Sequence, residues 1–150
     1  MGTTEPSRVL YLDASAIVKL VVAEAETDAL RSYVEGGQLV TNEIALTEVP
    51  RAAYLRTGAS EVFDKAESVL RRFDLVTLDE ELHRAAARRP PRELRTLDAI
   101  HLVSALRVRE RLQAVVVYDH RLAQAAREAG LVVDSPGVRP PEGASKPRRR

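Results

Sequence analysis

Short apolar segments alternate along the chain with longer segments of helical periodicity. The apolar segments are residues 9–12, 38–41, 75–78, 114–118 and 131–133. They are too short for buried helices, and the segment 114–118 is apolar on both faces rather than at every second residue. Strands of this kind, separated by helices, are typical of a parallel sheet that is covered on both sides. We therefore predict the α/β class, as a three-layer sandwich with a short-stranded, mainly parallel central sheet.

Helices are expected between these strands, and capping side chains and glycines set their boundaries. The predicted helices cover residues 14–22, 24–35, 43–56, 61–73, 80–89, 97–109 and 120–129. Asn42, Ser60, Asp79 and Thr96 are the expected N-caps. Pro50 should kink or interrupt the helix 43–56, because its ring removes a helical donor.

Composition limits the chain to one domain. Its 150 residues, 45% of them hydrophobic, suffice for a single core, and the absence of cysteine excludes disulfides, Cys-ligated zinc and thiol catalysis. The net charge is +1, yet residues 135–150 contain five basic residues and one acidic residue. We predict a folded domain over residues 1–134 and a basic, disordered tail over 135–150. The longest stretch without charged residues, 99–106, is too short to cross a membrane, and we expect a soluble, cytoplasmic protein.

Acidic residues stand where this fold places its functional sites. Asp13 and Asp119 each directly follow a predicted strand, and sites in parallel sheets form at the carboxyl ends of strands. Asp98 lies in the first turn of a predicted helix, and Glu48 lies in an apolar helical stretch. A purely structural role, as a helix cap or beside a helix dipole, is the alternative for each Asp. Carboxylates that converge without interleaved Lys or Arg would repel one another unless a cation joined them, and oxygen ligands select Mg²⁺ or Mn²⁺.

Four segments resemble the acidic motifs of PIN-domain ribonucleases, most closely the toxin components of VapBC-type bacterial toxin–antitoxin pairs. The segments are VLYLDASA at 9–16, TEV at 47–49, LDAIHL at 97–102 and YDHRL at 118–122. The resemblance covers residues 8–134. It implies a Rossmann-like sheet and a site dependent on magnesium or manganese, with Asp13, Glu48, Asp98 and Asp119 as the metal-site acids and Ser15 as the accompanying hydroxyl. Val117 departs from the pattern, since many relatives have Ser or Thr two residues before the last acid.

The resemblance also implies function and partners. It predicts a metal-dependent endoribonuclease that hydrolyses RNA phosphodiester bonds, a cognate antitoxin protein as partner, and a homodimer. Apolar residues on more than one side of the helices 14–22 and 24–34 suggest a groove for an amphipathic segment of the antitoxin. They are Ile17, Leu20, Val21, Val22, Leu30 and Val34.

Two other functions stay open. One is a PIN-like domain that binds RNA or a partner without cutting, although no acid of the four motifs is lost. The other is a phosphatase like the haloacid dehalogenases, with Asp13 as nucleophile; such enzymes have a second acid two residues later, where this chain has Ser15.

Other polar residues are given structural roles at this stage. His101 lies three residues after Asp98, but its apolar neighbours favour a packed, hydrogen-bonded side chain over a metal ligand. Residues 84–95 contain five arginines and one glutamate, which could follow an RNA backbone. We favour a solvated surface for this segment.

Overall fold

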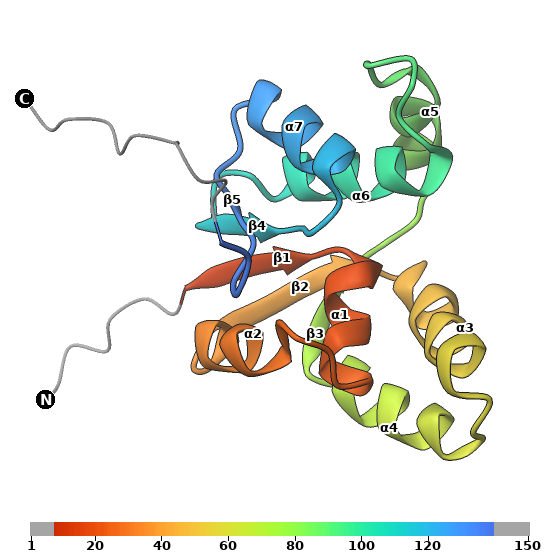
Figure 1. Ribbon diagram of the computed structural model, residues 1–150. Helices are drawn as coiled ribbons and strands as arrows, with labels where there is room; N and C mark the ends of the chain where they lie inside the picture. The colour runs from red at the N-terminus through yellow and green to blue at the C-terminus, as the bar shows by residue number, and fades with distance from the viewer. Residues whose placement is uncertain (1–7, 140–150) are drawn as a thin grey trace, which may run out of the picture.

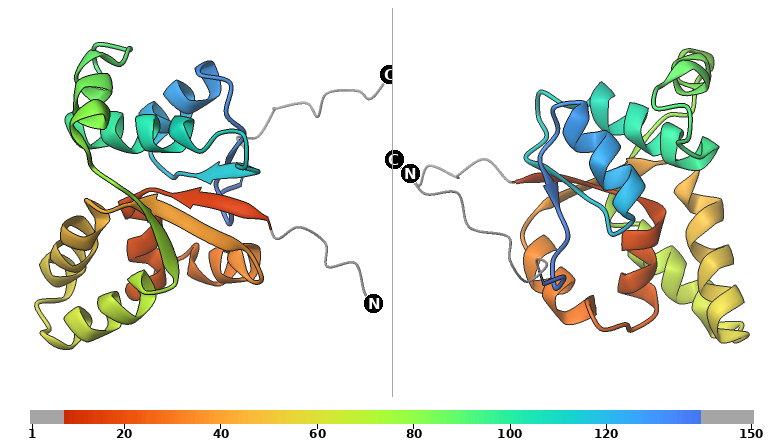
Figure 2. Two further views of the ribbon diagram at one scale, coloured as in Figure 1. Left: turned by 180° about the vertical axis from the view of Figure 1, so that it is seen from behind. Right: turned by 45° about the horizontal axis from the view of Figure 1, so that its top comes forward.

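The computed structural model of the chain describes residues 8–139. A five-stranded sheet forms its centre, in the order β3-β2-β1-β4-β5 with every neighbouring pair parallel. The strands are β1 (Val9–Leu12), β2 (Gln38–Asn42), β3 (Phe73–Val76), β4 (Ala114–Val116) and β5 (Val133–Asp134). Strand order reverses between β1 and β4, which pair with Leu12 opposite Val116. The back view in Figure 2 shows β3 at an edge of the sheet.

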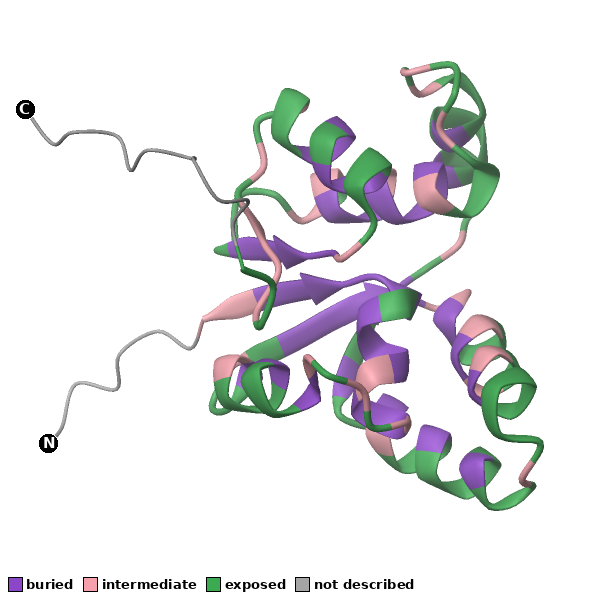
Figure 3. Ribbon diagram, in the orientation of Figure 1, coloured by how far each residue is buried: buried purple, intermediate pink, exposed green. Residues whose placement is uncertain are grey.

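Seven helices in the described residues cover the sheet on both faces, as the three-layer prediction requires (Figure 1). One face carries α1 (Ala14–Val21), α2 (Thr27–Val34), α3 (Ala45–Thr57) and α4 (Glu61–Leu70). The other carries α5 (Glu80–Arg88), α6 (Thr96–Arg107) and α7 (His120–Glu128). Side chains of β1 alternate between the two cores: Leu10 and Leu12 pack with the first group, and Tyr11 packs with the second. The strands are therefore mostly buried (Figure 3).

Several predicted boundaries are wrong for identifiable reasons. The helix expected over 61–73 ends at Leu70, because Phe73 pairs with Leu39 as the first residue of β3. Ser60 precedes that helix but makes no side-chain capping hydrogen bond. Thr96 is the first residue of α6 rather than its cap, since Arg95 has the extended backbone of an N-cap. Pro50 does not interrupt α3, because the helix continues from Ala45 to Thr57 with Pro50 inside it.

The prediction of an antitoxin groove on α1 and α2 is also wrong, because the apolar residues expected to line it are not exposed. Ile17, Leu30 and Val34 are at most 2% exposed, and Leu20 and Val21 are buried with them in the core under the sheet. The apolar sides of α1 serve several neighbours at once, because α2, α3 and α4 all pack on it. The large exposed apolar side chains of this face lie instead on α3, α4 and β3: Leu46, Tyr54, Leu55, Phe63 and Leu75.

Specific contacts continue past residue 134, where the tail was predicted to begin. Ser135 Oγ donates to the Val117 carbonyl at 2.5 Å, and the Tyr118 hydroxyl donates to the Pro136 carbonyl at 2.9 Å. Residues 140–150, most of the predicted tail, lie outside the described residues. Across residues 8–139, no helix has both the length and the apolar character needed to cross a membrane.

A pair of leucine substitutions checks the burial of α2. Leu30→Ala should lower the free energy of unfolding by about 2–5 kcal/mol, because Leu30 is fully buried. Leu55→Ala, at a position that is 73% exposed, should change it by less than about 0.5 kcal/mol. Urea unfolding measures both. Equal small effects would mean that α2 is not packed as described.

Candidate active site

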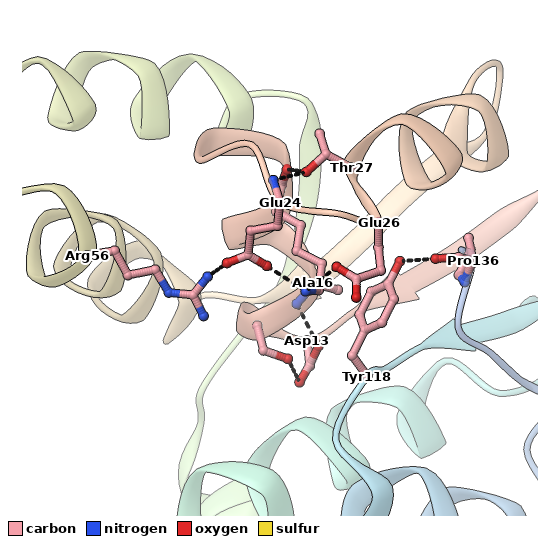
Figure 4. Close-up of polar contacts among 10 residues, drawn as sticks. Asp13, Ala16, Glu24, Glu26, Thr27, Arg56, Tyr118 and Pro136 are labelled. Carbon is pink, nitrogen blue, oxygen red and sulfur yellow. Dashed lines mark hydrogen bonds and ion pairs between the residues drawn. The ribbon is translucent and has the colours of Figure 1, made fainter. Parts of the chain in front are cut away.

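Two of the predicted acids follow β1 and β4, the strands between which the strand order reverses (the switch point). Each acid caps the N-terminus of the next helix. Asp13 follows β1 and caps α1: its Oδ1 accepts from the Ala16 amide at 3.1 Å, and its Oδ2 accepts from Ser15 Oγ at 2.8 Å (Figure 4). Asp119 follows β4 and caps α7, where its Oδ1 accepts from the amides of Arg121 and Leu122, each at 3.0 Å. The structural role weighed for these residues is therefore present in both.

The other two acids come from helices on opposite faces of the sheet. Glu48 lies in the first turn of α3, and Asp98 lies in the first turn of α6. A cavity of about 350 Å³, called here the acid cavity, brings the candidates together. Its lining includes all four predicted acids and the predicted hydroxyl, together with two basic side chains: Asp13, Ser15, Glu48, Asp98, Asp119, Arg95 and His101.

His101 is packed and hydrogen-bonded, as the sequence predicted, and only 3% exposed. Its Nδ1 lies 2.7 Å from the Tyr11 hydroxyl, and its Nε2 lies 2.7 Å from Glu48 Oε1. The contact with Glu48 was not predicted. A histidine among core positions signals burial, but only the fold reveals a partner 53 residues away.

Burial and mutual repulsion act on the acids of the cavity. Burial raises the pKa of Asp13, although the imidazole of His101 and the hydroxyl of Ser15 oppose the rise. Burial also raises the pKa of Asp98, and the charges of Asp119 and Asp13 raise it further. A bound cation would relieve both effects.

A nearby lysine does not supply that positive charge. Lys19 of α1 lies 2.5 Å from Glu24 and 3.1 Å from Glu26, and Arg56 pairs with the same Glu24 (Figure 4). The ammonium group of Lys19 also lies 4.7 Å from the centre of the Tyr118 ring. This cluster ties the α1–α2 loop to α3 and leaves the acid cavity with an excess of carboxylates.

The cavity offers a cation the right donor chemistry but not a preformed ligand set. Glu48 and Asp119 each use one oxygen in the hydrogen bonds given above, which leaves Oε2 and Oδ2 for a ligand. Oxygen donors of this kind suit Mg²⁺ or Mn²⁺. Within residues 8–139, however, no three Asp, Glu or His side chains are already grouped closely enough to hold a metal ion. Binding would therefore require the carboxylates that line the cavity to move closer together.

Comparison with known proteins identifies the family. The PIN domain model matches residues 10–128. The chain belongs to the PIN domain family. Ribonuclease VapC47 of Mycobacterium tuberculosis (strain CDC 1551 / Oshkosh) is 37% identical over 137 residues, which are 87% of this chain and 98% of the relative. Ribonuclease VapC46 of M. tuberculosis (strain ATCC 25618 / H37Rv) is 40% identical over 135 residues, 85% and 97% of the two chains.

Solved structures support the same fold for this PIN domain. The M. tuberculosis toxin VapC20, described as cleaving the sarcin–ricin loop, aligns with a TM-score of 0.63 and 20% identity, covering 87% of this chain and 99% of the other. VapBC2 from Rickettsia felis, solved with a DNA fragment from its promoter, aligns with a TM-score of 0.59 and 14% identity, covering 85% and 98%.

The departure at Val117 also has a structural explanation in this PIN domain. Val117 is fully buried, and a hydroxyl there would have to enter the core that α5, α6 and α7 share. The two amides at the start of α7 orient Asp119 instead. Loss of the hydroxyl therefore does not leave Asp119 unsupported.

The raised pKa of Asp98 predicts how stability depends on pH without metal. A carboxyl group with a raised pKa in the folded state stabilises the fold below its ordinary pKa of about 4 and loses that contribution as the pH rises through the folded value. Asn cannot ionise, so the stability of Asp98→Asn relative to the parent should increase from pH 4 to pH 7. Urea unfolding in EDTA measures the difference. If Asp98→Asn is less stable than the parent by the same free energy at every pH, Asp98 only stabilises the N-terminus of α6.

Proposed function

We propose that the protein is a Mg²⁺- or Mn²⁺-dependent endoribonuclease and the toxin of a toxin–antitoxin pair. The observation that carries the proposal is the shared cavity of Asp13, Glu48, Asp98 and Asp119 at the switch point of a PIN domain. Relatives at 37% and 40% identity, named as ribonucleases, support the choice of RNA as substrate.

The four acids would have two kinds of part in the proposed reaction. Asp13 and Asp98 would be the principal ligands of the cation, and Glu48 and Asp119 would ligate through their free oxygens or orient the attacking water. When bound, the cation polarises the scissile phosphate and lowers the pKa of a water molecule. Ser15 and the amide of Ala16 hold Asp13 in one orientation, so this ligand loses little freedom on binding. Hydrolysis would leave a 5′-phosphate and a 3′-hydroxyl.

The alternatives receive less support. A phosphatase nucleophile at Asp13 would need a second acid at residue 15, and the residue there is a serine that donates a hydrogen bond to Asp13. A PIN-like domain that only binds would have no use for four acids gathered in one cavity.

An antitoxin is the proposed protein partner, supported by the fold shared with VapBC2 of R. felis. Five of the six apolar residues that the sequence placed in a groove on α1 and α2 are buried in the core, and Val22 is partly buried against it. A homodimer remains a prediction from the family resemblance.

Cleavage of RNA by purified protein tests the enzyme. The parent should cut single-stranded RNA in Mg²⁺ or Mn²⁺ and lose that activity in EDTA, and Asp13→Asn should abolish most of it. Asn keeps the capping of α1, so the fold should survive the change. Asp74→Asn, which removes an exposed carboxylate on β3, is the matched control and should cut normally. Cleavage that persists equally in Asp13→Asn would refute the proposed site.

A further inference from the structure

A second cavity adjoins the acid cavity and is lined by arginines. It has a volume of about 550 Å³ and lies between α5, the α5–α6 loop and the start of α6. Arg88, Arg89 and Arg92 line this arginine pocket, and none of its lining residues is an Asp or Glu among those described. Thr96 lines both cavities, so the two meet at the first residue of α6.

Arg88, Arg89 and Arg92 make no ion pair within residues 8–139. On the same two helices, Arg84 pairs with Glu80, and Arg107 pairs with Asp79. The guanidinium groups that line the pocket therefore keep a concentrated positive charge beside a cavity of carboxylates. Arg84 and Arg107 do not line the pocket, so three arginines without an ion pair gather in it and the two ion-paired arginines of these helices lie outside it.

We propose that the arginine pocket binds backbone phosphates of the RNA nucleotides that flank the scissile bond. The carboxylates of the acid cavity repel the polyanionic backbone on either side of the scissile phosphate, and cationic groups close by would offset this repulsion. Arginine suits phosphate because its planar fork donates two hydrogen bonds to one phosphate. The choice of RNA as ligand rests on the proposed function; the anion-binding character of the pocket rests on its lining.

Binding and cleavage are measured separately to test this. In an Asp13→Asn background, fluorescence anisotropy gives the Kd of a labelled single-stranded RNA at several salt concentrations. Replacing Arg88, Arg89 and Arg92 by Ala should weaken binding about 10-fold or more at low salt. It should also reduce the slope of log Kd against log salt by about 0.7 to 2, for one to three lost phosphate contacts.

A second triple variant of equal charge is the control. Arg31→Ala, Arg72→Ala and Arg127→Ala remove three exposed arginines from α2, the α4–β3 turn and α7. Equal changes of slope in both triple variants would show that only net charge matters and would overturn the proposal. An unchanged slope in the pocket variant would also overturn it. RNA binding through the pocket by a parent protein that cuts no RNA would refute the proposed function alone.

A different observation carries a second inference: a chain of hydrogen bonds reaches the acid cavity from the core. Tyr11 of β1 is fully buried and contacts His101 of α6, which in turn contacts Glu48 of α3. A tyrosine hydroxyl has an ordinary pKa of about 10, so it carries its proton at neutral pH. When it donates that proton to Nδ1 of a neutral imidazole, Nε2 carries the ring hydrogen and donates to Glu48.

We propose that Tyr11 and His101 are positioning residues that hold Glu48 for its part in the acid cavity. Tyr11 selects the tautomer, and His101 fixes Oε1 of Glu48 so that Oε2 is left for a ligand. This role rests on the proposed function through Glu48. It does not require His101 to contact metal or RNA.

Nitrogen NMR of the metal-free protein tests the order of donors, and Mn²⁺ titration calorimetry tests the consequence. The His101 ring should carry its proton on Nε2. Tyr11→Phe and His101→Leu should weaken Mn²⁺ binding about 10-fold or more, the effect typical of residues that orient a ligand. His101→Gln, whose amide can still donate to Glu48, should recover part of the loss.

Tyr33→Phe is the matched control, because it removes a tyrosine hydroxyl that donates to Asp134 on another part of the sheet. Normal Mn²⁺ affinity in both Tyr11→Phe and His101→Leu, with only their stability lowered, would overturn the positioning role. So would a proton on Nδ1 in the parent. If the parent binds no Mn²⁺, the metal in the proposed function is refuted, and the NMR result alone decides the hydrogen-bond order.

Discussion

All four acids of the cavity lie at the N-terminal ends of helices, and the site depends on this placement. Asp13 and Asp119 cap α1 and α7, while Glu48 and Asp98 occupy the first turns of α3 and α6. In a parallel sheet, helices that follow strands begin at one edge, and α1, α3 and α7 do so; α6 follows α5, but its first turn reaches the same cavity. Each helix end stabilises a nearby carboxylate by about 0.3–1 kcal/mol. This partly offsets a repulsion that would otherwise oppose folding.

Sequence reasoning succeeded where one local rule and the global fold agree. The strand at 9–12 and the acid after it were both readable, because a short apolar run that ends on Asp predicts a strand followed by a cap. The same holds for Asp79, whose Oδ1 accepts from the Leu82 amide as expected. Convergence of Asp13 and Asp119 followed from the rule that sites form where parallel strands end, and the family resemblance added Glu48 and Asp98.

Sequence reasoning failed where strand pairing or the packing of helices on one another determines the structure. Phe73 has helical neighbours in sequence, yet pairing with β2 makes it a strand residue. The apolar surplus on α1 suggested a binding groove because sequence shows how much apolar surface a helix has, not how many neighbours cover it. Glu48 and His101 illustrate the same limit: their separation in sequence gives no sign of contact.

Buried polar groups fix α6 on the sheet, and this matters because α6 serves both cavities. Apolar packing is non-directional and alone would tolerate a small slide of the helix. Hydrogen bonds are directional and would break if the helix slid. Two of them join α6 to strands of the sheet: Tyr11 of β1 contacts His101, and Asn42 of β2 donates to Ser104 at 2.9 Å. Both partners on α6 are at most 3% exposed, so breaking either contact would leave a buried polar group unsatisfied. Displacement of α6 would therefore carry this energetic penalty. The penalty keeps Thr96, which lines both cavities, and Asp98 in a fixed position relative to Asp13 and Asp119, which follow β1 and β4.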